Sequence, residues 1–386
     1  MSNIEVTRTS WLTRLKNALT GIVVGIILII ATSILLVWNE TRAVKTYQSL
    51  VEGKAAVVAG DAQTLDGSLE GQLVHVQGAI TPNSDPEDMT SGVWAEGAVA
   101  LTRTVEMYQW IEKQESKTEK NLGGSEETVT TYSYEKGWSM SPQKSSDFRT
   151  PEGHENPAFP LDSAQFNVPD ANLGAYVLAG EVLAPLGTSQ VMEFSDEDAP
   201  AIGAALGLTA PTAQIAGALY AGNNPNSPEV GDIKVVYERI DLAEASFVAK
   251  QVGNGLEEYA TSNGYMVFLS AAGLVSSDQL FADAQDANAF LTWILRASGL
   301  IFMFVGFAAS LKVLSVIGDV IPFVGTVIGY GTGLFSLIAT LCLGSLMIAL
   351  GWFAARPLLS IAIVLGAALI VAGITYVKKK QAVAVV

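Results

Sequence analysis

The sequence predicts a multi-pass α-helical membrane protein with four spans, in which a large extracytoplasmic α+β domain lies between spans 1 and 2. Two observations predict this fold class. Residues 19–39 and 320–355 contain no charged side chain, and an apolar run of about 18 or more residues is typical of a membrane span. Charge is also divided unevenly, because residues 40–286 carry 36 of the 38 acids but only 13 of the 22 bases. We therefore expect an acidic domain between two apolar, mildly basic ends.

The first predicted span, residues 19–38, has about 20 residues, which at 1.5 Å per residue cross a hydrocarbon core of ~30 Å. Arg8, Arg14 and Lys16 precede it, and basic residues keep their flank of a span in the cytoplasm. Residues 1–18 are therefore predicted to be a cytoplasmic N-terminal segment. A cleaved signal peptide is the alternative, but this run exceeds the usual length of about 7–15 residues and no small-residue cleavage site follows it directly.

Three further spans are predicted in the C-terminal region, at residues 291–311, 331–354 and 358–377. The stretch 312–330 is interrupted by Asp319 and Pro322, so we expect it to be a cytoplasmic or re-entrant connection. Three lysines follow the last span in a basic tail, residues 378–386, which predicts a cytoplasmic C-terminus. Because both chain ends then lie on one side, the number of spans must be even.

Residues 39–290 are too polar to lie in lipid and are predicted to form the α+β domain, as one or two folded units. Alternation of apolar and polar residues predicts strands at 73–77, 99–110, 128–134, 232–239, 245–251 and 264–270. Alanine- and leucine-rich composition predicts helices at 170–186 and 199–221. The charged stretch 113–127, with Gly123-Gly124 at its centre, indicates a long hairpin tip or a mobile loop.

The composition excludes several kinds of site. A single cysteine, Cys342, cannot form an intramolecular disulfide or a cysteine metal site. Two histidines, His75 and His154, are too few for a histidine-rich metal centre, so we expect no metal and no cofactor. The formal charge of −16 also argues against nucleic-acid binding, which needs a basic surface.

The strongest candidate for chemistry is the motif Gly153-His154-Glu155-Asn156-Pro157. A histidine beside a carboxylate could act as a general base or a metal ligand, but we favour a structural turn in which His154 bonds the backbone. No Gly-x-Ser-x-Gly nucleophile motif is present. The acidic clusters 85–88 and 196–198 lack the EF-hand spacing and are interpreted as solvated loops. We therefore predict that the protein is not an enzyme.

Glycine spacing in the predicted spans bears on helix packing. Gly21/Gly25, Gly325/Gly329 and Gly329/Gly333 have the small-x-x-x-small spacing that lets helix backbones approach each other closely. We interpret these pairs as modest support for helix association.

Two arginines lie near the predicted outer ends of spans. Arg296 and Arg356 can act there as interfacial anchors, because long basic side chains reach the water interface. Alternatively, they pair with acids of the outer domain, for example Asp283 or Asp286. Both interpretations stay open at this point.

Several short motifs, in the same order along the chain, resemble those of the LUMA (transmembrane protein 43) family. The residues that carry the resemblance are Glu106, Tyr108, Trp110, Tyr132, Tyr134, His154, Asn156, Pro157, Gly231, Asp232, Trp293, Arg296, Gly351, Trp352, Arg356 and Pro357. The resemblance extends from the first predicted span to the last. It is patchy between residues 172 and 221, and the loop 113–127 differs in detail.

This resemblance implies four spans, both termini in the cytoplasm or nucleoplasm, and a large lumenal domain, which agrees with the charge pattern. In eukaryotes it implies the endoplasmic reticulum and inner nuclear membrane, where the family is thought to oligomerise and organise membrane protein complexes. The family also occurs in bacteria, and the acidic, cysteine-poor composition here fits a bacterial inner-membrane member with a periplasmic domain. The resemblance implies no catalytic residues.

The expected function is a non-enzymatic membrane scaffold that forms homo-oligomers and organises membrane structure, membrane protein complexes or a stress response. Membrane lipids and other membrane proteins are its expected partners. The alternative is a channel or small-solute transporter that uses residues 313–330, with Asp319 lining its path. A third hypothesis is an outer domain that binds lipid or peptidoglycan.

Overall fold

The computed structural model describes residues 3–355, which form two compact units. The β-rich unit comprises residues 3–7, 51–117 and 128–284, and the helical unit comprises residues 8–50, 118–127 and 285–355. The expected fold class is confirmed in its coarse form, because three helices that could span a membrane accompany a large β-rich unit. The fourth predicted span, residues 358–377, lies outside the described residues, as do Arg356 and Pro357.

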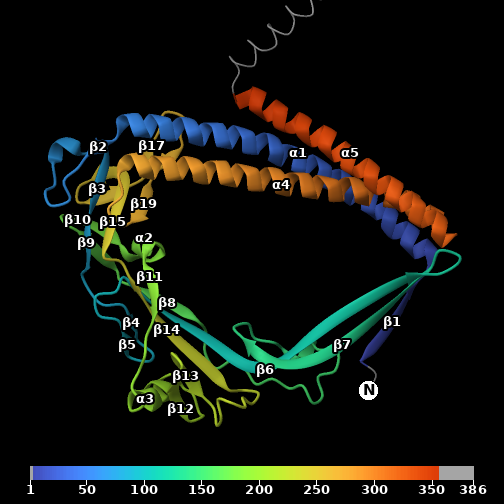
Figure 1. Ribbon diagram of the computed structural model, residues 1–386, viewed down its shortest axis with the longest axis horizontal. Helices are drawn as coiled ribbons and strands as arrows, with labels where there is room; N and C mark the ends of the chain where they lie inside the picture. Colours follow the sequence, from blue (N-terminus) through green and yellow to red (C-terminus); the bar gives the residue numbers. More distant parts are fainter. Residues whose placement is uncertain (1–2, 356–386) are drawn as a thin grey trace, which may run out of the picture. The chain divides into compact units, whose positions relative to one another are not determined.

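Three long helices dominate the helical unit: α1 (Trp11–Ala56), α4 (Ser277–Gly318) and α5 (Pro322–Ala355). Each is long and apolar enough to cross a membrane, and Figure 1 shows them side by side. Local chemistry fixes where they begin. Ser10 accepts a hydrogen bond from the backbone N–H of Thr13 (3.2 Å) and caps α1. Pro322 occupies the first position of α5, where its missing N–H costs nothing.

The helices extend beyond the predicted spans. α1 continues from Trp38 to Ala56, and α4 begins at Ser277 and runs to Gly318. The stretch 312–330, expected to be a connection, is therefore mostly helical, with only residues 319–321 between α4 and α5. The sequence predicts that Asp319 and Pro322 interrupt a single stretch, residues 312–330. In the structure they lie at the boundary between α4 and α5.

The larger sheet of the β-rich unit has the strand order β1-β7-β6-β14-β13-β12, with β11 beside β14 and β8 beside β6. Its strands are β1 (Ile4–Thr9), β6 (Ala100–Lys120), β7 (Glu126–Ser139), β8 (Ala164–Asn167), β11 (Thr188–Val191), β12 (Thr212–Ile215), β13 (Ala218–Ala221) and β14 (Ile233–Asp241). The long β6–β7 hairpin confirms the first of the two interpretations of residues 113–127. The tip of this hairpin, residues 118–127, belongs to the helical unit.

The second sheet has the order β10-β9-β3-β15-β16, with β19 beside β15 and β2 parallel to β3. Its strands are β2 (Val58–Ala59), β3 (Leu73–Pro82), β9 (Asp170–Leu173), β10 (Tyr176–Ala179), β15 (Glu244–Val252), β16 (Gly255–Glu257) and β19 (Leu269–Ala272). Five of the six predicted strands, all except the last, appear at their expected places as β3, β6, β7, β14 and β15. The sixth, residues 264–270, is divided between β18 (Met266–Val267) and β19.

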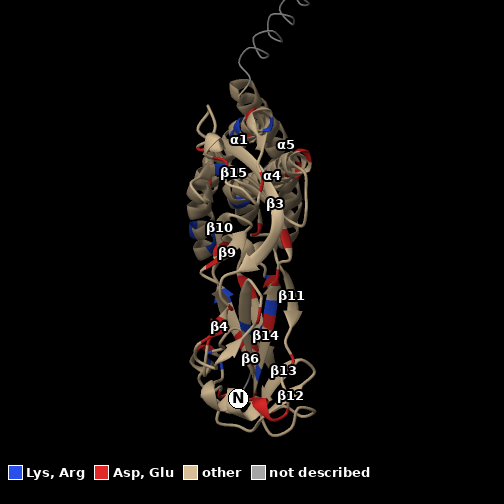
Figure 2. Cartoon of the chain, turned by 90° about the vertical axis from the view of Figure 1, so that its left-hand side faces the viewer, with Lys and Arg blue, Asp and Glu red and all other residues tan. Residues whose placement is uncertain are grey.

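Short elements complete the described chain. They are β4 (Glu87–Asp88), β5 (Val93–Trp94), β17 (Tyr259–Ala260), β18 (Met266–Val267), α2 (Gly180–Leu183), α3 (Asp198–Ala205), η1 (Gly67–Leu69), η2 (Ser145–Asp147) and η3 (Ala184–Leu186). Figure 2 marks the positions of acidic and basic residues along the strands of the β-rich unit.

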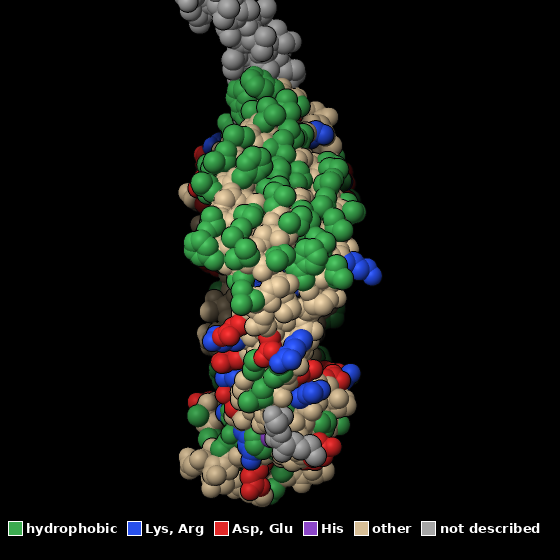
Figure 3. Space-filling model, turned by 90° about the vertical axis from the view of Figure 1, so that its right-hand side faces the viewer, with side chains coloured by type: hydrophobic (Ala, Val, Ile, Leu, Met, Phe, Trp, Pro, Cys, Tyr) green, Lys and Arg blue, Asp and Glu red, His purple; other side chains and the backbone are tan. Residues whose placement is uncertain are grey.

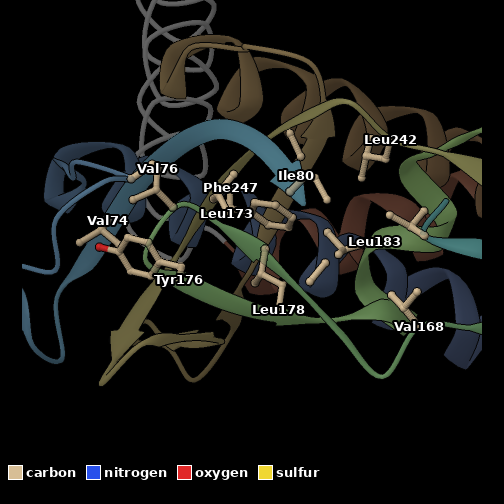
Figure 4. Close-up of a cluster of buried hydrophobic side chains, with 14 residues drawn as sticks. Val74, Val76, Ile80, Val168, Leu173, Tyr176, Leu178, Leu183, Leu242 and Phe247 are labelled. Carbon is tan, nitrogen blue, oxygen red and sulfur yellow. The ribbon is translucent and has the colours of Figure 1, made fainter. Parts of the chain in front are cut away.

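Each sheet of the β-rich unit has its own apolar core. Figure 4 shows the core of the second sheet, in which Val74, Leu173, Tyr176 and Phe247 are fully buried. The larger sheet buries a second cluster that includes Val105, Leu219 and Val235. In β6 and β14 alternate residues enter the core, because successive side chains of a strand point to opposite faces.

The two helices predicted inside residues 39–290 are wrong. Residues 170–186 form the β9–β10 hairpin and only one turn of α2, and residues 199–221 form α3 and the β12–β13 hairpin. Ala216 and Gly217 both have positive φ, 48° and 80°, as a tight two-residue hairpin turn requires. The sequence did not predict this turn, because it has Ala216-Gly217 in place of the usual Asn-Gly or Asp-Gly.

Candidate functional site

Family-motif residues of the β-rich unit meet in one aromatic and hydrogen-bonded network on β6 and β7. Asn156 fixes the loop after β7 to β6, because its Oδ1 accepts from the Trp110 N–H (2.7 Å) and its Nδ2 donates to the Trp110 carbonyl (2.9 Å). The Tyr134 hydroxyl donates to Glu112 Oε2 (2.7 Å) and accepts from the Thr150 N–H (2.9 Å). Every polar group in this set therefore has a partner within the fold.

His154 has a structural place in the same network. Its Nδ1 lies 3.0 Å from the Thr150 carbonyl oxygen, and its ring stacks on Tyr134 at 3.8 Å between centroids. This is the kind of backbone contact that the interpretation of the motif as a structural turn expects. The neighbouring Glu155 accepts from the Gly153 N–H (2.9 Å), and this bond lowers the pKa of its carboxyl group. A carboxylate held in this way by the turn is poorly placed to serve the imidazole as an acid–base partner.

A second group of motif residues fixes β14 to β6. The Gly231 N–H donates to the Tyr108 carbonyl (2.9 Å), and the Tyr108 N–H donates to the Asp232 carbonyl (2.8 Å). The Asp232 carboxylate accepts from the Tyr220 hydroxyl and from the Glu229 N–H. Glu106 lies opposite Lys234 in the register between β6 and β14. These residues therefore hold β6, β13 and β14 together.

In the helical unit, Arg296 of α4 pairs with Glu40 of α1. Its Nε and Nη2 donate to the two carboxylate oxygens at 2.6 and 2.7 Å. The Glu40 side chain is 3% exposed and that of Arg296 is 22% exposed. This finding answers the open question about Arg296, since its partner is an acid of the neighbouring helix and neither Asp283 nor Asp286. Trp293, one turn earlier, lies under the guanidinium at 4.8 Å.

Other polar side chains continue this contact between α1 and α4. Asn39 Nδ2 donates to the Thr292 carbonyl (3.1 Å), and Arg42 donates to Asn288 Oδ1 and Thr292 Oγ1 (both 3.1 Å). Asn288 Nδ2 donates in turn to the Ala43 carbonyl (3.0 Å). A hydrogen-bonded layer therefore joins the two helices beside the Glu40–Arg296 ion pair.

Glycines allow the three helices to approach closely. A Cβ on Gly25 of α1 would lie 2.3 Å from Ser310 Oγ and 2.4 Å from the Gly306 carbonyl oxygen of α4. On α5, a Cβ on Gly351 would lie 2.8 Å from Glu40 Cβ, and one on Gly344 would lie 2.2 Å from a methyl group of Leu300. Trp352 follows Gly351 and packs edge-on against Phe353. Of the predicted glycine pairs, Gly21 and Gly25 therefore face α4, whereas Gly333 meets no atom within 4 Å, and Gly344 and Gly351 were not among the predicted pairs.

Four charged side chains meet at the N-terminal end of α1. Asp319 is fully buried and accepts from Arg14 and from Lys120 Nζ (2.9 Å). Arg14 also pairs with Glu126 (2.8 Å) and donates to the Gly124 carbonyl. We call Arg14, Lys120, Glu126 and Asp319 the charge cluster. Its two cations and two anions balance, as burial requires.

The sequence did not predict that Glu40 is the partner of Arg296. It also did not predict that the four residues of the charge cluster meet. A signal for the first was present, because Glu40 directly follows the uncharged run 19–39 and Arg296 is the one base within another apolar run. The charge cluster offered no such signal, because Lys120 and Glu126 are far from Arg14 and Asp319 along the chain.

The hydrogen bonds and ion pairs described above connect elements of the fold to one another. Among residues 3–355, no group of three or more histidine, cysteine, aspartate or glutamate side chains could hold a metal ion. The one histidine in the aromatic network is held by backbone and stacking contacts. In contrast, the visible face of the helical unit is covered by hydrophobic side chains (Figure 3), and exposed examples include Val23, Ile27 and Phe335.

The family model described as Transmembrane protein 43 matches residues 107–357. This chain belongs to the transmembrane protein 43 family. Transmembrane protein 43 of Mus musculus and of Homo sapiens are each 30% identical to it over 360 residues, covering 90% of this chain and 88% of each relative. The transmembrane protein 43 homolog of Drosophila melanogaster is 31% identical over 372 residues, covering 90% of this chain and 91% of its own length. No solved structure matches the chain.

The range matched by the transmembrane protein 43 family contains both the aromatic network on β6 and the packing of α4 against α5. Tyr108, Asn156 and Asp232 lie in it, as do Arg296 and Gly351. The membrane character expected from the apolar runs is therefore confirmed by family and by structure together.

Proposed function

We propose that this member of the transmembrane protein 43 family is a non-enzymatic integral membrane scaffold. It embeds its helical unit in the bilayer, forms homo-oligomers and organises membrane structure or membrane protein complexes. One observation carries the proposal: polar side chains of the helical unit bond to one another while the outer surface is apolar. The Glu40–Arg296 ion pair joins α1 to α4, and the Asp319–Arg14 ion pair joins α1 to the residues after α4. The outer surface of the helical unit therefore presents apolar side chains that can pack against other helices.

Small residues on the outer side of α5 support the oligomer. Gly331 and Gly333 meet no atom within 4 Å in the described chain, whereas Gly344 and Gly351 are filled by neighbouring helices. An open small-residue position on an apolar helix permits close approach of another helix. A second copy of this chain is the simplest occupant, since homo-oligomers are the commonest assemblies.

The channel hypothesis receives less support from the geometry. It assigned Asp319 to the lining of a path through residues 313–330. Asp319 is instead fully buried and paired with Arg14 and Lys120. A carboxylate that is neutralised by two cations has little remaining attraction for a permeating ion.

Crosslinking in native membranes tests the scaffold. The full chain is treated with an amine-reactive crosslinker, and products are identified by mass spectrometry. We expect covalent dimers or larger assemblies, and a lower yield for Gly331→Leu, because the added side chain blocks close helix approach. Gly67→Leu is the matched control, since Gly67 of the β-rich unit also meets no atom within 4 Å. Monomers alone, with no partner protein, would contradict the proposal.

A further inference from the structure

A cavity of about 340 Å³ lies within the helical unit, between the start of α1 and the end of α4. Further along α1 the two helices are in close contact, because Gly25 meets Gly306 and Ser310. At Gly21 they begin to separate, since a Cβ there would lie 3.4 Å from the Ala309 carbonyl oxygen. The cavity opens from this point, and its volume falls within the ~300–1,000 Å³ that is typical of small-molecule sites.

Small and apolar side chains form one part of the cavity wall. Ala18 and Gly21 line it from α1, and Ala309 and Val316 line it from α4. Ala18 and Val316 are 3% and 2% exposed. These side chains offer apolar contact and no hydrogen-bond donor, so this part of the cavity suits a hydrocarbon group.

Two basic side chains line the other part of the cavity. Arg14 is paired with Glu126, which also lines the cavity, and with Asp319. The charge cluster to which these three residues belong is neutral as a whole. Lys312 is exposed and lines the cavity, and it forms no ion pair with an acid of residues 3–355. The cavity therefore has a positive charge in excess.

Both cations flank the apolar runs of their helices. Arg14 precedes the uncharged run 19–39, and Lys312 directly follows the predicted span 291–311. Basic side chains beside the end of a span attract anionic lipids, and basic pockets between membrane helices bind their headgroups. The position of the cavity along the sequence therefore favours a lipid headgroup as its ligand.

An apolar path continues from the cavity along both helices. Val24 lies one turn from Gly21 on α1, and Val305 lies one turn from Ala309 on α4. Residues three or four apart share one face of a helix, and Val24 and Val305 are 55% and 46% exposed. An amphipathic molecule can therefore place its phosphate at Lys312 and its acyl chains along the valines, whereas a free phosphate ion uses only the first contact.

We propose that this cavity binds the phosphate group of an anionic phospholipid, with Lys312 as the main contact. The ammonium group attracts the phosphate as a point charge, and Thr9 and Asn17, which also line the cavity, supply hydrogen-bond donors. The headgroup of phosphatidylglycerol neutralises the excess charge of Lys312, whereas the choline of phosphatidylcholine brings a second cation to the same place. The inference rests on the proposed embedding of the helical unit in the bilayer and does not need oligomerisation.

Native mass spectrometry of the full chain in detergent tests the site. Phosphatidylglycerol and phosphatidylcholine are added in equal amounts, and the lipids retained by each chain are counted. We expect phosphatidylglycerol to be retained in preference. Lys312→Gln should weaken its retention about fivefold, which is the contribution of one basic side chain near an anionic lipid surface, and Lys312→Arg should keep it. Because Lys312 is exposed and unpaired among the described residues, neither substitution should change the melting temperature.

Lys16→Gln is the matched control. Lys16 is an exposed cation of the first turns of α1 and is not among the residues that line the cavity, so this variant should retain phosphatidylglycerol as wild type does. An equal loss in Lys16→Gln and Lys312→Gln, or no preference for phosphatidylglycerol in wild type, would overturn the proposal.

Inorganic phosphate, added in place of lipid, distinguishes the two sources of a phosphate group. Retention of phosphate without a preference for phosphatidylglycerol would assign the cavity to a free ion and overturn the lipid assignment. The same spectra report the mass of each assembly. Monomers that retain phosphatidylglycerol would contradict the scaffold alone, whereas assemblies that retain none would contradict the lipid site alone.

Discussion

At the scale of single residues, polar groups in this protein are held by partners that differ with their surroundings. In the β-rich unit, Asp88 is fully buried and accepts from the Arg103 guanidinium, the Tyr237 hydroxyl (2.6 Å) and the Thr90 N–H (3.0 Å). Burial alone would raise the pKa of Asp88, but the bonds from Tyr237, Thr90 and Arg103 together lower it. Burial, and then the bond to Asp88, raises the pKa of the Tyr237 hydroxyl.

This lowered pKa gives a pH-dependent prediction. A carboxyl group with a depressed folded-state pKa stabilises the fold above its unfolded value of about 3.9, and this contribution is lost as pH falls through the folded pKa. We expect Asp88→Asn to lower the free energy of unfolding by about 3 kcal/mol near neutral pH. The deficit should shrink in acid, as wild-type Asp88 is protonated.

Thermal unfolding of the full chain in lipid nanodiscs, measured from about pH 7 to about pH 3, checks this expectation. Glu87→Gln is the control, because Glu87 is the exposed neighbour of Asp88 and should change little. A melting-temperature difference between Asp88→Asn and wild type that stays constant in acid would contradict the assignment.

At the scale of elements, the pattern of apolar and polar residues predicted those strands and turns that local sequence determines. The strands β6 and β14 alternate in burial over much of their length, and they were expected, as were β3 and β15. The charged β6–β7 turn was expected from Gly123-Gly124. The β9–β10 and β12–β13 hairpins were not, because alanine favours helix on its own and only pairing with neighbouring strands overrides it. Likewise, the charge pattern indicated that Arg296 is unusual, but it did not predict that its partner is Glu40 of α1.

Helix packing supplies the element-scale prediction. Gly25→Leu forces a side chain into Ser310 and the Gly306 carbonyl, both within 2.4 Å of its Cβ. Such overpacking costs typically about 1–3 kcal/mol, and backbone on one side leaves little room to adjust. We expect a clearly lowered melting temperature in nanodiscs. Gly67→Leu, at a position of the β-rich unit with no atom within 4 Å, should melt within experimental error of wild type, and an equal loss in both variants would refute the packing account.

At the scale of the whole molecule, a different kind of polar contact stabilises each of the two units. Networks on β6 and β7 hold the β-rich unit, and ion pairs hold the helical unit. The membership of the chain in the transmembrane protein 43 family was predictable from short motifs in order. Which of these motif residues contact one another was not, because Tyr108 and Asp232 meet through the pairing of β6 with the chain at β14, and Asn156 reaches β6 from the loop after β7.

The central claim is that the ion pair between Glu40 and Arg296 holds the helices of the helical unit together. Charge exchange at Glu40 and Arg296 tests it most directly, with thermal stability of the full chain in nanodiscs as the measurement. Glu40→Arg and Arg296→Glu should each lower the free energy of unfolding by about 3 kcal/mol or more, because each leaves like charges buried together. The double exchange should recover most of that loss. Single variants as stable as wild type, or a double variant no better than either single one, would contradict the claim.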